Sequence, residues 1–245
     1  MKKVLEVENV SRDFGSVKAV SGLSLSLGAG EIMGFLGTNG AGKTTTIKML
    51  IGLIRPSAGS VRILGGDPVR TEVRARLGYM PETACYYPYL NARELLDFYG
   101  GLCGLEPRFV RRRGDELLAR VGLAEAAKRP LKTYSKGMLQ RAGIAQALLA
   151  DPELLVLDEP FTGLDPLARI RFRELMRELR DEGKSIFFSS HELGETELLC
   201  DRVTIMKRGT SVYQGSVRDI AGDGKGNLER LFLRVLGEDG KEERP

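Results

Sequence analysis

The sequence predicts an α/β fold with a mostly parallel core sheet, an antiparallel β part at the N-terminus and an inserted helical subdomain. Apolar and polar residues alternate over residues 4–10 and 20–27, as in half-buried antiparallel strands. Short, continuous apolar runs follow at 32–36, 154–157 and 185–190. Such runs are typical of strands that are covered on both faces of a parallel sheet. With 245 residues, the chain is long enough for one large domain with a subdomain inserted in it.

Helical patterns fill the space between the apolar runs. The segment from about 83 to 150 is expected to be wholly helical and to form the inserted subdomain. Within it, Asn91 and Glu94 form a capping pair ahead of an apolar stretch. One face of a later helix in this segment is marked by Met138, Ala142, Ala145 and Leu149.

A second long helix is expected to begin at Asp165 and Pro166, because Asp caps a helix start and Pro suits its first turn. Leu175 and Leu179 continue its apolar face. Gly183 is expected to close it, since glycine tolerates the backbone conformation at a helix end.

The main domain is expected to cover residues 1–221, and residues 222–245 to form an appendage. Residues 222–227 ("GDGKGN") predict a flexible joint, and the last residues, 237–245, predict a disordered tail. Between them the apolar residues fall on one face of a short amphipathic helix: Leu228, Leu231, Phe232, Val235 and Leu236. Docking of this helix on its own domain is favoured over binding of a partner, and both remain open.

Composition excludes several classes of protein. The formal charge of +4 is a mild excess, and the basic run 111–113 contains no aromatic residue, so it is interpreted as a solvated helix face and no nucleic-acid partner is expected. The cysteines, Cys85, Cys103 and Cys200, form no CxxC pair and are expected to be reduced. No signal core and no apolar stretch of ~20 residues occurs. A cytoplasmic protein is expected, with any membrane role reached through a partner.

The segment Gly37 to Thr44 ("GTNGAGKT") fits the phosphate-binding pattern GxxxxGK[ST] and follows an apolar strand. Its glycines allow backbone N–H groups to surround phosphate oxygens, and the next helix adds its positive N-terminal dipole. Lys43 is expected to reach the β- and γ-phosphates, and the Thr44 hydroxyl to bind Mg²⁺. The residues expected to contact the nucleotide here are Thr38, Asn39, Gly40, Ala41, Gly42, Lys43, Thr44 and Thr45.

The segment "LLVLDEP" supplies two carboxylates at the end of a buried strand, where open α/β sheets bind ligands. Asp158 is expected to hold Mg²⁺ through its water shell. Glu159 is expected to polarise the attacking water, a contribution of ~10²–10⁴ in rate. Two acids after a strand also suit a helix cap, but beside the Lys43 loop this alternative becomes minor.

Two aromatic rings complete the candidate site. His191 is the single histidine and ends the strand "SIFFSSH", so a neutral imidazole could contact the γ-phosphate, although lone histidines are more often structural. Phe14 could stack on an adenine ring, and a core position is equally compatible with the sequence.

The ordered motifs "GTNGAGKTT", "GYMPE", "YSKGMLQR", "LLVLDEP", "GLDP" and "SSH" closely resemble the nucleotide-binding subunits of ABC transporters, from about residue 3 to 215. The resemblance implies a P-loop ATPase whose cofactors are ATP and Mg²⁺. It implies that two subunits, identical or closely related, pair head to tail. Ser135 and Gly137 of one would then cap the γ-phosphate held by Lys43 of the other.

The resemblance also implies an integral membrane permease as partner, at the cytoplasmic face of the membrane. Asp165 matches the family's loop that communicates across the dimer. Tyr86, Tyr87 and Tyr89 follow the position that receives a short helix of the membrane subunit, and a core role for these tyrosines is equally open.

The sequence departs from the family's common form at a few positions. Lys136 and Met138 stand where the signature motif usually has Gly and Gln, while Ser135 and Gly137 are retained. Glu82 replaces the usual Gln. It keeps an oxygen for Mg²⁺ or water, and so is expected among both the metal ligands and the catalytic groups. Thr38 replaces the usual proline. The signature and Glu82 resemble subfamilies that drive ABC-2-type exporters.

The sequence therefore predicts the ATP-hydrolysing subunit of a membrane exporter. The alternative is a single-cassette ATPase of a soluble assembly, such as iron–sulfur assembly. A GTPase switch is disfavoured because no NKxD motif occurs.

Overall fold

The structure, a computed structural model, describes residues 2–83, 85–221 and 227–237. Its first sheet is antiparallel, with the strand order β2-β1-β4. The strands are β1 (Lys3–Phe14), β2 (Val17–Gly28) and β4 (Ala58–Ile63). The antiparallel N-terminal part is confirmed, and both of its predicted strands are longer than the alternating segments.

The second sheet has the strand order β5-β6-β7-β3-β8-β9. All neighbours in it are parallel except β8 and β9. Its strands are β3 (Ile32–Gly37), β5 (Leu77–Met80), β6 (Leu154–Leu157), β7 (Ser185–Ser190), β8 (Arg202–Lys207) and β9 (Thr210–Ser216). Every residue of β3, β6 and β7 is buried, which confirms the reading of the three apolar runs as strands covered on both faces.

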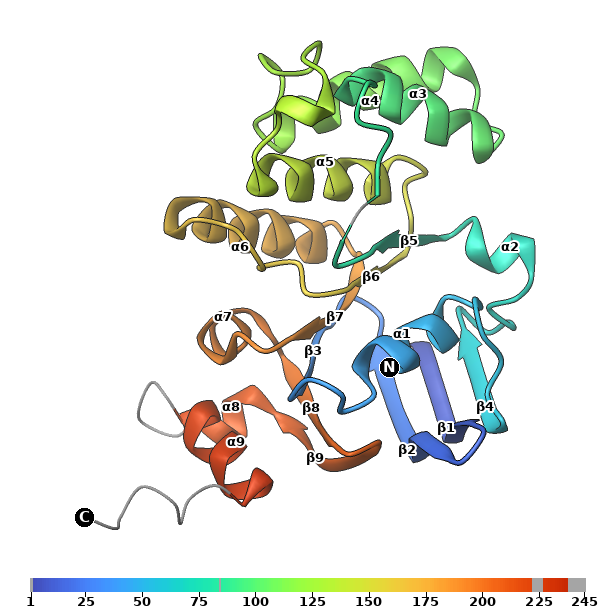
Figure 1. The fold of residues 1–245 in the computed structure, drawn as a ribbon, viewed down its shortest axis with the longest axis vertical. Helices are drawn as coiled ribbons and strands as arrows, with labels where there is room; N and C mark the ends of the chain where they lie inside the picture. The colour runs from blue at the N-terminus through green and yellow to red at the C-terminus, as the bar shows by residue number, and fades with distance from the viewer. Residues whose placement is uncertain (1, 84, 222–226, 238–245) are drawn as a thin grey trace.

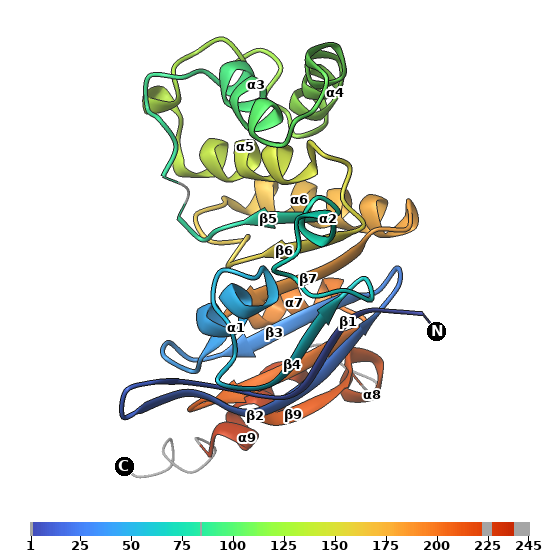
Figure 2. The ribbon, with the colours of Figure 1, turned by 90° about the vertical axis from the view of Figure 1, so that its right-hand side faces the viewer.

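The six-stranded sheet separates two apolar cores, since Ile32 and Leu36 of β3 belong to one core and Met33 and Phe35 to the other. Helices cover this sheet on both sides (Figures 1 and 2). Helix α1 (Lys43–Leu50) lies between the two sheets and packs with the N-terminal strands. Helices α6 (Pro166–Asp181) and α7 (Leu193–Leu199) belong to the other core. The short helices α2 (Thr71–Arg74) and α8 (Val217–Ala221) lie at the periphery.

Helix α6 forms as its sequence predicts. Asp165 caps it by accepting a 2.8 Å hydrogen bond from the backbone N–H of Ala168. The helix ends at Asp181, and Gly183 follows with the left-handed φ of +89°.

The inserted subdomain contains α3 (Ala92–Leu102), α4 (Pro107–Arg120), the 3₁₀ turn Leu131–Thr133 and α5 (Lys136–Leu148). The predicted capping box of Asn91 and Glu94 is present. The expectation of a wholly helical segment is wrong for residues 85–91, 103–106 and most of 121–135, which are turns and loops. Helix α5 is also buried nearly all round, since it lies between α3 and α4 on one side and the sheet and α6 on the other (Figure 1).

Helix α9 (Asn227–Leu236) docks on its own domain. Leu228 and Leu236 are buried in the core that contains α6 and α7. The Glu197 carboxylate accepts hydrogen bonds from the backbone N–H groups of Asn227 and Leu228, at 3.1 and 3.3 Å. The predicted joint, apart from Asn227, and all of the predicted tail except Gly237 lie outside the described residues. In the described part of the chain, no helix is both long and apolar enough to cross a membrane.

Candidate functional site

The phosphate-binding loop joins β3 to α1. Gly40 and Gly42 have left-handed φ angles of +77° and +103°. A Cβ atom on Gly42 would lie 2.6 Å from the backbone oxygen of Ala19, so the close approach of two backbones requires glycine here. The buried Lys43 donates from Nζ to the backbone oxygen of Gly37 at 2.7 Å. The loop thus holds a buried ammonium at the start of a helix, which suits an anionic ligand.

Asp158 follows β6 and is almost fully buried. The hydroxyl of Ser189, on the neighbouring β7, donates to its Oδ1 at 2.5 Å. Burial raises the pKa of the Asp158 carboxyl, the charges of Glu159 and Glu82 add to this effect, and the Ser189 hydrogen bond opposes it. A nearby cation would offset this unfavourable environment, so the site fits a carboxylate that faces a metal ion.

Glu159 contacts both the phosphate-binding loop and the histidine that follows β7. Its φ of +49° is unusual for a residue with a side chain, and its backbone N–H donates to Ser189 Oγ at 3.0 Å. Its Oε1 lies 3.4 Å from Lys43 Nζ, and its Oε2 lies 2.8 Å from His191 Nδ1. The strained backbone therefore directs the carboxylate between the phosphate-loop lysine and the histidine.

His191 lies directly after β7, and its side chain is 54% exposed. Its backbone N–H also donates to Glu159 Oε2, at 3.3 Å. The ring is thus attached to the site on one side and open on the other. This arrangement differs from that of a buried structural histidine.

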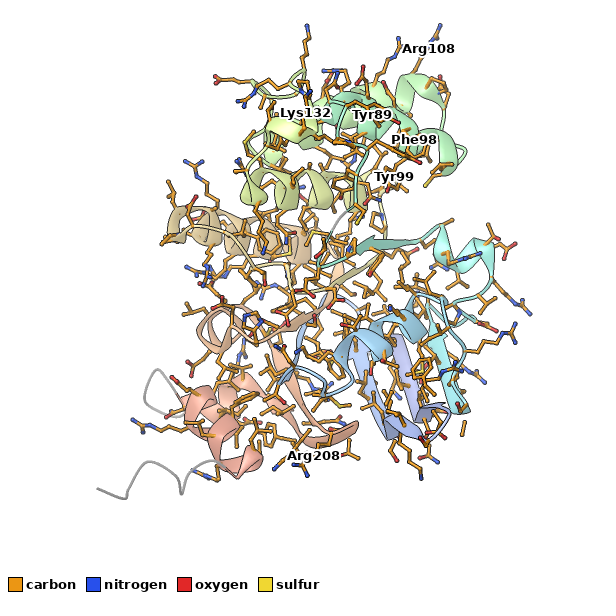
Figure 3. All side chains as sticks on the ribbon, in the orientation of Figure 1. Tyr89, Phe98, Tyr99, Arg108, Lys132 and Arg208 are labelled. Atoms are coloured by element: carbon orange, nitrogen blue, oxygen red, sulfur yellow. The ribbon has the colours of Figure 1, made fainter. Side chains whose placement is uncertain are left out.

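A cavity of about 540 Å³ lies over Lys43, Glu159 and His191. The buried Asp158 precedes Glu159 in the chain and is not among the residues that line this cavity. Glu82 and the whole segment 38–45 line it, together with Glu159 and His191. Four further residues that the sequence does not predict for the site also line the cavity: Val17, Lys18, Ala19 and Arg208. Arg208 lies in the β8–β9 turn (Figure 3), whose Gly209 N–H donates to the Ala41 backbone oxygen at 3.0 Å. No motif marks Lys18 or Arg208, because only folding brings them to the loop.

Phe14 is not among the residues that line this cavity. It lies at the end of β1, is 48% exposed, and has the Arg12 guanidinium 4.6 Å from its ring centroid. The alternative of a core position for Phe14 is therefore wrong.

Ser135 and Gly137 lie at the start of α5, and neither lines the cavity within the described part of the chain. Ser135 Oγ caps α5 by accepting a 3.2 Å hydrogen bond from the Met138 N–H. Because a hydroxyl can accept and donate at once, its O–H remains available for a second acceptor.

Glu82 reaches the site from the loop after β5. Its backbone oxygen accepts from the Gln140 amide at 3.4 Å, which ties it to α5. Among the described residues, no group of three or more His, Cys, Asp or Glu side chains could hold a metal ion alone. The residues expected to bind Mg²⁺ fit an ion that also takes phosphate oxygens and water.

The tyrosines after this loop form an aromatic cluster with α3. Tyr87 packs on Tyr89 and Phe98, with ring centroids 5.7 and 5.6 Å apart. Figure 3 shows Tyr89, Phe98 and Tyr99 gathered beside this helix. Tyr87 and Tyr89 are 50% and 70% exposed, while Tyr86 is partly buried against the core. Of these three tyrosines, only Tyr86 therefore has the core role that the sequence left open.

Comparison with known proteins identifies the family. A family profile described as "ABC transporter" matches residues 20–162, more than half of the chain. The chain belongs to the ABC transporter family. A Nostoc relative, named as an uncharacterized ABC transporter ATP-binding protein, is 47% identical over 84% of this chain. The Bacillus subtilis ATP-binding protein NatA is 39% identical, with 90% of this chain and 91% of NatA covered.

The chain spans 62% and 60% of the length of the relatives from Nostoc and Synechocystis. A solved ATP-binding subunit of an ABC transporter superposes on this ABC subunit with a TM-score of 0.86 at 33% identity, covering 95% of this chain and 99% of that one. The cbiO1 protein of Clostridium perfringens, part of an ABC transporter complex, gives 0.81 at 26% identity, with 97% of both chains covered. The fold and the predicted ATP-binding cassette are thereby confirmed.

Proposed function

We propose that this chain is the ATP-hydrolysing subunit of a membrane exporter, and that ATP drives its head-to-tail dimerisation. The observation that carries the proposal is the contact of Glu159 with both Lys43 and His191 beneath one cavity. A phosphate-loop cation can hold the phosphate chain, and a carboxylate beside it can accept the proton of the attacking water, two functions that phosphoanhydride hydrolysis uses.

Each residue has a distinct role in this proposal. Lys43 and the loop N–H groups bind the phosphate chain, and Glu159 accepts a proton from the attacking water. His191 keeps the Glu159 carboxylate oriented. Mg²⁺, when bound with ATP, supplies positive charge at the phosphates, and the residues that would hold it are Thr44, Glu82 and Asp158.

The second half of the site comes from another subunit in this proposal. The exposed start of α5 offers the Ser135 O–H and the free N–H groups of a helix end, which suit a γ-phosphate. Neither Ser135 nor Gly137 lines the cavity of its own chain. Pairing would bring them to the partner's nucleotide and exclude water, so that hydrolysis becomes coupled to closure.

The role in export rests on relatives. The linearmycin resistance protein LnrL of Bacillus subtilis is 38% identical over 89% of this chain. The daunorubicin resistance protein DrrA3 of Streptomyces coeruleorubidus is 35% identical over 96% of it. The exposed aromatic rings of Tyr87 and Tyr89 suit a permease contact at the cytoplasmic face of the membrane.

The Glu159→Gln variant tests the site. It should bind ATP, lose hydrolysis by about 10²-fold or more, and elute as a nucleotide-bound dimer in size-exclusion chromatography. Lys43→Ala should neither hydrolyse ATP nor dimerise with it. An E159Q protein that stays monomeric in saturating ATP yet hydrolyses it normally would refute the assignment.

Affinity purification of the tagged chain from detergent-solubilised membranes tests the partner. A multi-spanning membrane protein in near-equal amount is expected. Soluble partners alone would favour the soluble-assembly alternative and leave the ATP site intact.

A further inference from the structure

Helices α6 and α7 are joined by two arginine–glutamate pairs one helical turn apart. Arg169 pairs with Glu192, and Arg173 pairs with Glu195. The first pair is the nearer to the candidate site, since Glu192 directly follows His191 and Arg169 lies four residues after Asp165. The helices α5, α6 and α7 are stacked in this order in both views (Figures 1 and 2).

Arg169 uses all three of its guanidinium nitrogens. Nη1 and Nη2 donate to the two carboxylate oxygens of Glu192, at 3.0 and 2.8 Å. Nε donates to the backbone oxygen of Leu164 at 3.2 Å. The planar guanidinium of Arg169 thus holds Glu192, the residue after His191, and Leu164, in the loop before α6, at the same time. The ammonium group of a lysine cannot make this set of hydrogen bonds.

The segment that carries His191 is fixed on both sides of Glu192. The Glu192 N–H donates to Ser190 Oγ at 2.9 Å, and its backbone oxygen accepts from the Thr196 hydroxyl at 3.0 Å. His191 itself contacts Glu159 through both its ring and its N–H. The Arg169 fork connects this segment to α6.

We propose that Arg169 is a positioning residue for ATP hydrolysis. Through Glu192 it holds His191 against Glu159, and through the Leu164 oxygen it links this contact to the loop of Asp165. The inference rests on the proposed roles of Glu159 and His191. It predicts that movement of the Asp165 loop changes the orientation of the His191–Glu159 pair.

Arg173 provides a matched control on the same helix. Its pair with Glu195 is more buried, with side-chain exposures of 16% and 14%, against 27% and 28% for Arg169 and Glu192. Arg173 pairs with Glu195, and among the described residues no hydrogen bond or ion pair joins it to the Asp165 loop or to Glu192. If both pairs serve only to hold α7 against α6, loss of the more buried Arg173–Glu195 pair should lower both thermal stability and kcat at least as much as loss of the Arg169–Glu192 pair.

The experiment compares R169Q and R173Q in the full chain. R169Q should lower kcat by about tenfold with KM for ATP nearly unchanged, because it misplaces groups that act during reaction. In the nucleotide-free protein, it should also accelerate amide hydrogen exchange at residues 191–193. R173Q should keep kcat within about twofold of wild type, although its thermal midpoint falls at least as far.

Two further variants sharpen the test. R169K should stay as slow as R169Q, because lysine keeps the charge and loses the fork. R169Q/E192Q should be no slower than R169Q, since both changes break one contact. Should R169Q fail to fold, R169K and E192Q supply the same comparison.

The inference is overturned if R169Q and R173Q reduce kcat equally, if R169K restores full turnover, or if exchange at 191–193 does not change. A different result would overturn the proposed function itself. In that case Glu159→Gln and His191→Ala would both turn over normally, whatever the Arg169 variants do.

Discussion

At the residue scale, Asp158 illustrates how a functional group works against stability. Burial raises its pKa, so the folded, nucleotide-free protein binds a proton more tightly than the unfolded chain. The free energy of unfolding should therefore fall as pH rises from the unfolded pKa of about 3.9 toward neutrality.

Asp158→Asn should remove this penalty. At pH 7 the nucleotide-free variant should melt at a higher temperature than wild type, while Mg²⁺-dependent hydrolysis is lost. The gain should vanish below about pH 4, where both states are protonated. Thermal unfolding of both proteins between pH 3 and 8 measures this difference in melting temperature.

Asp151 serves as a control because its carboxyl pKa is shifted in the opposite direction, downward. The hydrogen bond from Lys184 lowers the pKa of its carboxyl, so Asp151 stabilises the fold above its unfolded pKa and loses this effect as pH falls. Asp151→Asn should therefore destabilise the protein slightly at pH 7 and not in acid. A D158N protein that is less stable than wild type at neutral pH would contradict the account of the buried carboxylate.

Residues of the site differ in how far the sequence could reveal them. Lys43 and Glu159 lie in short motifs whose geometry is local, a loop after a strand and the end of a strand. Lys18 and Arg208 reach the same cavity from β2 and from the β8–β9 turn. Such contacts depend on sheet order, which no local pattern encodes.

At the element scale, local patterns predicted elements well where one face or one cap decides the structure. Helix α6 has its Asp165 cap and its Gly183 end, and β3 is a short buried run. Helix α5 was described less well, because a helix buried nearly all round has no polar face to reveal its surroundings. The loops on either side of α3 and α4 were missed for a different reason, because the apolar pattern marks helices and not the turns between them.

Helix α9 allows the contribution of one docked element to be measured. Leu228 is fully buried, whereas Leu233 on the same helix is 37% exposed. Leu228→Ala should cost about 2–4 kcal/mol of unfolding free energy, and Leu233→Ala less than about 0.5 kcal/mol. Urea unfolding gives both values. Equal losses for the two variants would argue against docking of α9 on its own domain.

At the scale of the whole molecule, one chain carries two surfaces that would face different nucleotides in the proposed head-to-tail dimer. The cavity holds Lys43 and Glu159, while Ser135 and Gly137 lie outside its lining. In a head-to-tail pair, each site would take its phosphate loop from one subunit and its α5 start from the other. The inference rests on the separation of these surfaces in the fold, which the motifs alone do not show.

A mixing experiment tests this arrangement. Lys43→Ala removes the phosphate-loop cation. Gly137→Asp places a carboxylate at the start of α5, where a helix end tolerates it and a phosphate does not. A Cβ atom at Gly137 would meet its nearest neighbours at 3.5 Å, so the fold has room for the change.

Each variant alone should be inactive, since both sites of its homodimer carry a defect. In a mixed dimer both defects fall in one site, and the other combines an intact Lys43 with an intact Gly137. Random pairing at equal mixing would make half of the dimers mixed, so about a quarter of wild-type activity is the upper limit of recovery. The weaker ATP-driven pairing of the Lys43→Ala chain should lower the recovered activity below this limit. A side-by-side dimer with complete sites in each chain would recover nothing, because every chain carries a defect, and absence of recovery would therefore count against the shared site.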